Sequence, residues 1–470
     1  MNDSMQQIVE RRALGDRDSS AADPINRKRR RFLALGALGV SLCVTRGHRP
    51  AFALGETASA NAFDAEVASF WFDETLRTVR ETVSTPPAAA RAIGYVSIAV
   101  YEAARVATGH RSLAGQLNGL RDVTSAPADV DHHAPSVIAA AVIELLPTLF
   151  PARDPVTIRI GEVNAMRFTQ RYEQGIPAEQ HRRSRELGGA IGRAIGEWSK
   201  EDGAATQDLT FPKVGSGGRH PPSATGEWVP TGFEYNEAML PRWGSNRPFV
   251  LPSAEVVDPG PPPAFSREPD SPFYREAKRV YDAVKAVTPE QSQSALFWAD
   301  NPGQSNTPAG HWIAVLGQVL RDRHSSLDEA VASYARLGIT LNDVAIACWY
   351  TKYRYKLVRP VTYIHEVIDP RFEPLMATPP FPEYTSGHSA ISAAAAEILT
   401  RQFGTLSYID LTNKTFPFGK PRRFDSFAAA AREAALSRFY AGIHYESAIE
   451  RGLEQGQRVA ERVNVLDLRV

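Results

Sequence analysis

The chain has 470 residues, enough for a large hydrophobic core or for two or three domains of ordinary size. Its 53 Lys and Arg residues balance 53 Asp and Glu residues, so no basic surplus predicts a nucleic-acid partner and no acidic surplus predicts a solvating tail. A site for an anion must therefore be local. The two cysteines, Cys43 and Cys348, exclude a disulfide framework and a zinc-type spacing, and we expect both to be small buried residues.

Residues 1–53 have the pattern of an export signal. The basic stretch RKRRRFL at 27–33 precedes the apolar run ALGALGVSLCV, and Ala51-Phe52-Ala53 has the form of a cleavage site. Arg29-Arg30-x-Phe32-Leu33 fits a twin-arginine signal, so we expect a periplasmic or extracellular protein. The apolar run is too short for a stable membrane anchor, and no later segment predicts a membrane span.

The pattern from residue 60 to 202 predicts helices. The stretch FDAEVASFWFDETLRTVRETV has apolar residues at three and four spacing, and RAIGYVSIAVYEAARVA is apolar nearly all round. Residues 203–272 are instead rich in Gly and Pro, which disfavours long helices. Aromatic residues are interleaved there, so we interpret the segment as an ordered covering loop rather than a free linker.

Helical patterns resume at about residue 273 and continue to residue 470, and no repeat of fixed period is present. Because strand-like alternation is scarce, the predicted fold class is all-α. The helices form either a single bundle or a main bundle, at 273–470, with the N-terminal helices packed on it.

A first group of candidate site residues is Lys352-x6-Arg359-Pro360. Seven residues are close to two helical turns, so we expect Lys352 and Arg359 on one side of a helix that Pro360 ends. Two cations at one helix end could bind an anion. Taken alone, the charge run equally predicts a solvated basic face.

A second group lies in PPFPEYTSGHSAIS, residues 379–392. Ser386 is a natural N-cap for the helical pattern that follows, and Gly387 lets an anion approach the backbone closely. A helix N-terminus offers free N–H groups and the positive end of the dipole, so Ser386 and Gly387 could bind an oxyanion. His388 would then lie beside it. An ordinary capped helix with an incidental histidine explains the stretch about equally well.

The third group is Ser437-Arg438-x5-His444. On one unbroken helix Arg438 and His444 would point to different faces, but Gly442 between them predicts a break. We expect Arg438 to end one helix and His444 to begin the next, so that both can face one point. A helix hairpin with a surface arginine and a capping histidine is the alternative.

As a set, the three groups resemble the signature of the vanadium-dependent haloperoxidase and type 2 phosphatidic acid phosphatase superfamily, K-x6-R-P, then P-S-G-H, then S-R-x5-H. The matching residues, in order and spacing, are Lys352, Arg359, Pro360, Ser386, Gly387, His388, Ser437, Arg438 and His444. The match covers roughly residues 349–448. It implies the family's α-bundle, with which the helical character of the first 200 residues agrees.

Two aromatic residues favour the haloperoxidase branch. Trp349 and Phe381 look like the residues that line the halide side of the pocket in that branch, and an apolar wall there would lower the local dielectric. Simple burial in the core is the other interpretation of both. Asp300 is a candidate counter-ion for Arg438 or orienter of His388, although an ordinary Asp-Asn-Pro turn also explains it.

The resemblance implies vanadate as the cofactor. His444 would be its single protein ligand, His388 the acid–base group, and the cradle would consist of Lys352, Arg359, Ser386, Gly387 and Arg438. The implied substrates are hydrogen peroxide, a halide and an organic acceptor, with no nucleic acid; the oligomeric state is not predicted.

Three departures leave alternatives open. Thr385 stands where the family has proline, Val358 where an aromatic is common, and Ala448 where phosphatases carry an aspartate that orients the last histidine. With Glu446 as the nearest acid in sequence, we expect no orienting carboxylate, which disfavours a phosphohistidine mechanism more than a metal-ligand role. The alternatives are a phosphatase, in which His444 attacks phosphorus and phosphate is substrate, and a catalytically degenerate binding protein.

Overall fold

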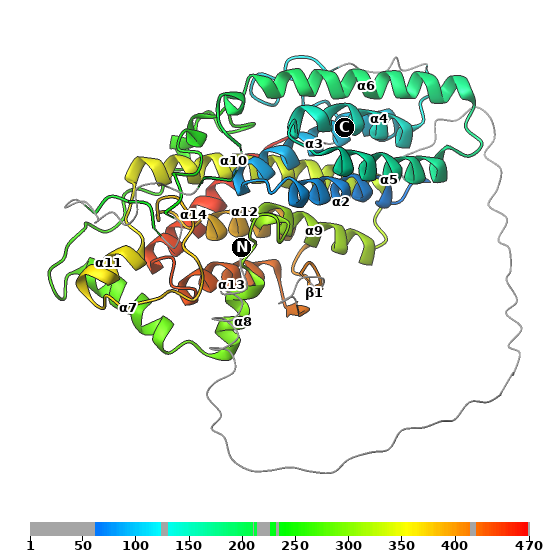
Figure 1. Ribbon diagram of the computed structural model, residues 1–470. Helices are drawn as coiled ribbons and strands as arrows, with labels where there is room; N and C mark the ends of the chain where they lie inside the picture. The colour runs from blue at the N-terminus through cyan, green and yellow to red at the C-terminus, as the bar shows by residue number, and fades with distance from the viewer. Residues whose placement is uncertain are drawn as a thin grey trace, which may run out of the picture. The chain divides into compact units, whose positions relative to one another are not determined.

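The computed structural model describes residues 62–123, 130–209, 211–213, 226–231, 235–413 and 420–468, all within one compact unit, Thr57–Val470 (Figure 1). The predicted signal at 1–53, with Cys43, lies outside these residues. Helices dominate the described chain, so the predicted all-α class is confirmed.

The first half of the bundle consists of α2 (Glu66–Glu81), α3 (Pro86–Thr108), α4 (Ala134–Leu149), α5 (Pro155–Glu173) and α6 (Ala178–Lys200). The helix α3 is buried almost all round, as its apolar sequence predicts, whereas α5 buries only a narrow stripe.

The second half contains α7 (Pro272–Lys285), α8 (Pro289–Phe297), α9 (Thr307–Asp322), α10 (Leu327–Tyr355), α11 (Pro360–Val367), α12 (Gly387–Phe403), α13 (Phe427–Tyr440) and α14 (Glu446–Val463). A small antiparallel pair, β1 (Tyr408–Asp410) and β2 (Arg422–Phe424), joins α12 to α13, with Tyr408 opposite Phe424.

The long helix α10 connects the two halves. It packs against α3 on one side and against α12 and α14 on the other (Figure 1), so one hydrophobic core runs through both. Glycines bring the backbones of α3 and α10 close: a Cβ on Gly338 would lie 2.0 Å from Ser97 Oγ. The three motifs predicted from the sequence lie on α10, on the helices that follow it and on the segments between them.

Two glycines four residues apart set the contact between α12 and α14. A Cβ on Gly456 would lie 2.1 Å from the carbonyl oxygen of Ala390, and one on Gly452 would lie 2.8 Å from that of Ser386. Real Cβ atoms do not approach backbone this closely, so larger side chains would force the helices apart. The start of α12 is therefore held against α14.

The segment 203–272 contains only the short 3-10 helices η2 (Ala204–Thr206), η3 (Trp243–Ser245) and η4 (Ala254–Val257) among its described residues. The buried Asp343 of α10 anchors this segment by accepting the backbone N–H groups of Phe249 (2.6 Å), Val250 (2.8 Å) and Leu251 (3.0 Å). The side chain of Trp243 is fully buried. A carboxylate with three backbone donors thus joins the segment to the core.

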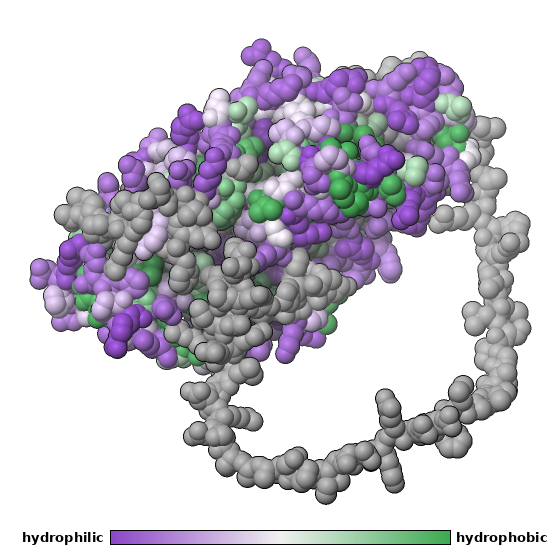
Figure 2. Space-filling model, viewed as in Figure 1, coloured by the Kyte–Doolittle hydropathy of each residue, from purple (hydrophilic) through white to green (hydrophobic). Residues whose placement is uncertain are grey.

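Figure 2 shows a largely hydrophilic face, with apolar residues gathered over α5, where Val156, Ile160 and Met166 are exposed. No helix within the described ranges has both the length and the apolar character needed to cross a bilayer.

Candidate active site

The prediction that one continuous helix carries both Lys352 and Arg359 is wrong. The helix α10 ends at Tyr355, Lys356 has a left-handed backbone (φ 47°), and Arg359 is the N-cap of α11. Pro360 therefore opens a helix instead of ending one, because its fixed φ suits the first helical position and it holds Arg359 extended. Lys352 and Arg359 reach the same region from two helices.

Lys352 is fully buried and directs its ammonium group at the stretch 379–388. It donates to the carbonyl oxygens of Pro382 (3.0 Å), Glu383 (3.0 Å) and Thr385. Burial lowers the pKa of Lys352 to about 8. The lysine thus ties α10 to this stretch and adds positive potential beside it.

Two of the three guanidinium nitrogens of Arg359 have neighbours within hydrogen-bond distance among the described residues. Its Nε donates to the carbonyl of Phe381 (2.9 Å), and Nη1 donates to the carbonyl of Ile443 (2.9 Å) and lies 3.3 Å from His444 Nε2. Burial lowers the pKa of Arg359 to about 10, so it remains cationic at neutral pH. Nη2 is buried and has no hydrogen-bond partner.

Ser386 caps α12, as the sequence predicts. Its Oγ accepts the backbone N–H of Ser389 at 3.4 Å, and Gly387 is the first helical residue. A Cβ on Gly387 would meet only the Trp349 ring, at 4.0 Å, so this helix N-terminus has room beside it. His388 follows in the first turn. The free N–H groups of such a helix start favour an anion.

Arg438 and His444 lie on either side of the short segment that separates α13 from α14. Arg438 lies in the last turn of α13, Gly442 has φ 77°, and His444 lies two residues before α14 rather than within it. Arg438 Nη1 donates to the carbonyl of Trp298, and its Nε is buried without a partner. Burial lowers the pKa of Arg438 to about 10, and Asp300 opposes this shift.

One residue that the sequence did not reveal is Glu383. Its Oε1 accepts hydrogen bonds from His444 Nδ1 (2.8 Å) and from the backbone N–H of Tyr445 (2.8 Å). The expectation that no carboxylate orients His444 is therefore wrong, and Glu446 instead pairs with Arg279 at the surface. Burial raises the pKa of Glu383 to about 8, opposed by Arg359 and Lys352.

This contact fixes which nitrogen of His444 is available. Because Nδ1 donates to Glu383, the Nε2 lone pair faces Arg359. Burial, followed by the charges of Arg359 and Lys352, holds the pKa of His444 well below its usual value. A neutral imidazole with an unprotonated Nε2 is the form that binds a metal centre or attacks phosphorus.

Among the described residues, three buried polar atoms near these groups have no hydrogen-bond partner: Nη2 of Arg359, Nε of Arg438 and the ring atom Nε2 of His388. Buried donors of cationic groups are costly to leave unpaired, and an oxoanion supplies several acceptor oxygens at once. The residues present therefore fit vanadate or phosphate.

Trp349 and Phe381 lie together, with ring centroids 5.1 Å apart. The Phe381 ring also faces the cations of Lys352 (5.0 Å) and Arg359 (4.9 Å). Trp349 Nε1 donates to the carbonyl of Met239 in the covering segment (3.2 Å). The two rings form an apolar wall beside the cations, and their role toward halide stays a prediction.

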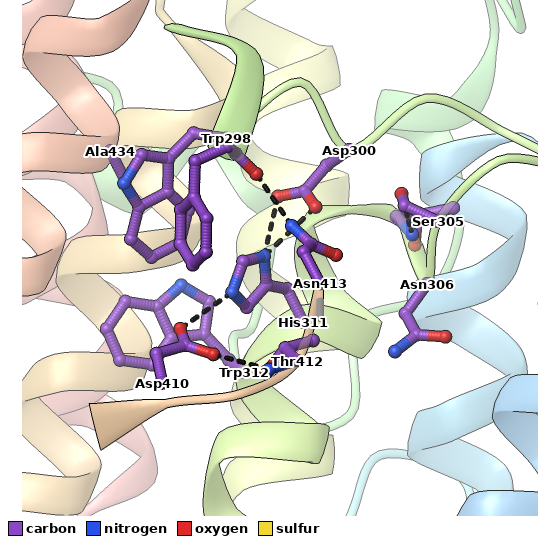
Figure 3. Close-up of polar contacts among 12 residues, drawn as sticks. Trp298, Asp300, Ser305, Asn306, His311, Trp312, Asp410, Thr412, Asn413 and Ala434 are labelled. Carbon is purple, nitrogen blue, oxygen red and sulfur yellow. Dashed lines mark hydrogen bonds and ion pairs between the residues drawn. The ribbon is translucent and has the colours of Figure 1, made fainter. Parts of the chain in front are cut away.

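Asp300 lies between both of its predicted partners. Its Oδ2 is 3.8 Å from His388 Nε2, and it interacts electrostatically with Arg438. It also makes close contacts with His311, a residue absent from the predictions (Figure 3). Burial, then Arg438 and His311, hold the pKa of His388 well below its usual value, so this ring is neutral at pH 7.

Comparisons with known proteins show which sequences and folds this chain resembles. Residues 332–467 match the family model of the VCPO second helical-bundle domain. The structure of the first bacterial vanadium-dependent iodoperoxidase is 35% identical in sequence, with a TM-score of 0.78, and the match covers 87% of this chain and 97% of that one. Holo and apo forms of a bacterial vanadium-dependent chloroperoxidase share the fold at 12% and 14% identity, with TM-scores of 0.58 and 0.54; each match covers 82% of this chain, and 92% and 94% of theirs. No curated protein matches the sequence.

Proposed function

Because this chain belongs to the vanadium-dependent haloperoxidase family, we propose that it is a vanadate-dependent enzyme that uses hydrogen peroxide to oxidise a halide. The observation that carries the proposal is a neutral His444 whose Nε2 lies beside the buried guanidinium group of Arg359, together with unpaired N–H donors on Arg359 and Arg438. Such a set suits one imidazole bond and several charge-assisted hydrogen bonds to the same oxoanion.

In this proposal each residue of the cradle has a distinct task. His444 Nε2 would be the ligand, with its ring orientation held by Glu383. Arg359 and Arg438 would bind the oxygens, while the N-terminal amides of α12 and the Ser386 hydroxyl add hydrogen bonds. Lys352 adds charge and fixes the stretch that carries these donors.

His388 would hold and release protons beside the bound anion. Burial keeps its ring neutral, so it can accept a proton from hydrogen peroxide at Nε2, the atom that has no hydrogen-bond partner. The Asp300 carboxylate, 3.8 Å away, would stabilise the cation formed. Bound vanadate supplies the Lewis acidity that activates peroxide toward halide attack.

The phosphatase alternative stays open because of Glu383. A carboxylate on His444 Nδ1 is what a nucleophilic histidine needs in order to stabilise its charge, and the chain supplies it from a position other than 448. In that reading His444 attacks phosphorus and His388 protonates the leaving oxygen.

One pair of assays separates these functions. The purified protein is loaded with orthovanadate and assayed for oxidation of iodide and bromide by hydrogen peroxide, in parallel with hydrolysis of a phosphate ester. Halide oxidation that requires vanadate supports the proposal, whereas hydrolysis that vanadate inhibits supports the phosphatase. A binding protein would show neither. Iodide is the first halide to test, since the 35% identical relative is an iodoperoxidase.

Two variants test the residue roles. His444→Ala should abolish vanadate binding, measured by calorimetry. His388→Ala should leave the dissociation constant near that of the wild type and lower turnover by about 10²–10⁴-fold, the range for loss of an acid–base group. The reverse pattern would refute both assignments.

We also propose export by the twin-arginine route, on the support of the pattern at 27–53. That route carries folded proteins, which suits an enzyme with a bound cofactor. Replacing Arg29 and Arg30 by lysine should retain the protein in the cytoplasm of an expressing bacterium, and unchanged export would contradict the proposal.

A further inference from the structure

His311 lies in the core of the bundle between two carboxylates (Figure 3). Its Nδ1 is 3.0 Å and 3.1 Å from the two oxygens of Asp300, and its Nε2 is 2.9 Å from Asp410 Oδ2. The side chains of His311 and Asp410 are fully buried, and that of Asp300 is 1% exposed. The three residues come from α9, from the turn before it and from β1.

This arrangement requires a charged ring. Two carboxylates can both be satisfied only if both ring nitrogens carry protons. Burial opposes that charge, but Asp300 and Asp410 overcome it and raise the pKa of His311 to about 10. The ring of Trp298 stacks on the imidazolium, with centroids 4.4 Å apart and planes 19° apart.

The outer carboxylate is firmly held. Asp410 Oδ1 accepts the backbone N–H of Thr412 at 2.8 Å, and His311 holds the pKa of Asp410 below its usual value. Gln318, also on α9, bonds the backbone N–H of Leu411 (2.9 Å) and the hydroxyl of Thr412 (3.2 Å). The position of His311 is thus fixed from the side away from the site.

The inner carboxylate is the one that faces the site. Oδ2 of Asp300, already in contact with His311, lies 3.8 Å from His388 Nε2, and Asp300 is the counter-charge of Arg438. Asp300 lies between α8 and α9, outside the helices, and both of its carboxylate oxygens lie within hydrogen-bond distance of His311 Nδ1. The carboxylate therefore depends on His311 for its orientation.

We propose that His311 is a positioning residue for the peroxidase reaction: its imidazolium, braced by Asp410, holds the Asp300 carboxylate between His388 and Arg438. The turnover measurements that test this inference rest on the proposed function. It differs from a purely structural ion triad because it predicts an effect on the proton chemistry of His388 as well as on folding.

The first experiment replaces the charge and keeps a hydrogen-bond donor. In His311→Gln, turnover with iodide and hydrogen peroxide should fall about 10- to 100-fold, the range for loss of a residue that orients a reacting group. Vanadate affinity should fall by a smaller factor than turnover, since His311 contacts no cradle residue directly and reaches Arg438 only through Asp300. In an Asp300→Asn background the same change should alter turnover less than about threefold, because the effect acts through Asp300.

The pH profile supplies a readout that a structural role would not move. The charged and titratable groups around His388 are Asp300 and His311 from the α9 side, Arg438 from α13, Lys352 from α10 and His444 before α14. Positive His311 lowers the pKa of His388, so His311→Gln should move the limb governed by His388 to higher pH. Lower turnover with an unmoved limb, or independent effects of the two substitutions, would overturn the inference.

A measurement on the unaltered protein covers the case in which the variant does not fold. With ¹⁵N-labelled histidine, one side chain should keep both ring nitrogens protonated at pH 8.5, and Asp410→Asn should weaken that signature. If no imidazolium is present at pH 8.5, the inference is wrong. Absence of halide oxidation by the wild type would refute the proposed function, whereas activity with unchanged variant profiles would refute only this inference.

Discussion

The contact between α12 and α14 predicts that Gly456→Ala separates the two walls of the site. The added methyl would lie 2.1 Å from the carbonyl oxygen of Ala390, and ordinary contact begins at about 3.4 Å, so the helices must move apart by about 1.3 Å at this level. Alanine is the better helix former by about 1 kcal/mol, but overpacking of this kind costs about 1–3 kcal/mol or more. We expect a net loss of about 2 kcal/mol of stability.

Gly196→Ala on α6 is the matched control. This glycine is also buried within a helix, but its Cβ would make ordinary contacts, the nearest being Thr148 Oγ1 at 3.5 Å. Alanine there should be neutral or stabilise the protein by up to about 1 kcal/mol. Urea unfolding of both variants measures the difference, which we expect to be about 2–3 kcal/mol.

The same displacement should reach the site, because Ser386 caps α12 and His444 lies just before α14. A misplacement of about 1 Å can lower a rate by about 10²-fold, so turnover and vanadate affinity of Gly456→Ala should both fall. Gly452 faces the carbonyl of Ser386, which is closer to the site than Ala390. Relative to the stability that each variant loses, Gly452→Ala should therefore lose more vanadate affinity than Gly456→Ala. If Gly456→Ala were as stable as Gly196→Ala, the backbone contact would not be what sets the helix spacing.

Three further changes test other parts of the structure. Glu383→Ala leaves His444 Nδ1 and the Tyr445 N–H without their acceptor, so the dissociation constant for vanadate, measured by calorimetry, should rise about 10- to 100-fold; an unchanged constant would show that Glu383 does not orient the ligand. Asp343→Asn weakens the acceptor of three backbone N–H groups and should lower the unfolding free energy by about 1–3 kcal/mol, with faster hydrogen exchange at residues 249–251. Burial lowers the pKa of His133 to about 4, so its neutral form stabilises the fold above pH 6.5 and about 3 kcal/mol should be lost as the pH falls from 6.5 to 4; His133→Gln should flatten that part of the stability curve.

Local patterns predicted what depends on local geometry. Apolar spacing predicted the helices, Ser386 was recognised as an N-cap, and Gly442 as a break, because each signal lies within a few residues of the structure it causes. The end of α10 was misplaced, since a proline after Arg359 suits either the end of one helix or the start of another.

Contacts between distant segments could not be read in this way. Glu383 meets His444 across 61 residues, and His311 meets Asp410 across 99. Glu383 lies in a stretch with no helical or strand pattern, and Asp410 ends a strand of only three residues, too short for its pattern to give the side-chain direction. Proximity in sequence selected Glu446 as the acid for His444, whereas the fold places that residue at the surface.

The stretch from Phe381 to His388 serves every other part of the site through its backbone as well as its side chains. The carbonyl of Phe381 accepts Arg359, three further carbonyls accept Lys352, and Glu383 holds His444. Inserting or deleting one residue here would move all of these groups away from their partners at once. Many side-chain substitutions would instead leave the backbone carbonyls in place. The length of this loop is therefore more tightly constrained than the identity of those residues that act only through their carbonyls, and libraries aimed at a new halide preference should vary positions other than Glu383, Ser386, Gly387 and His388 at constant length.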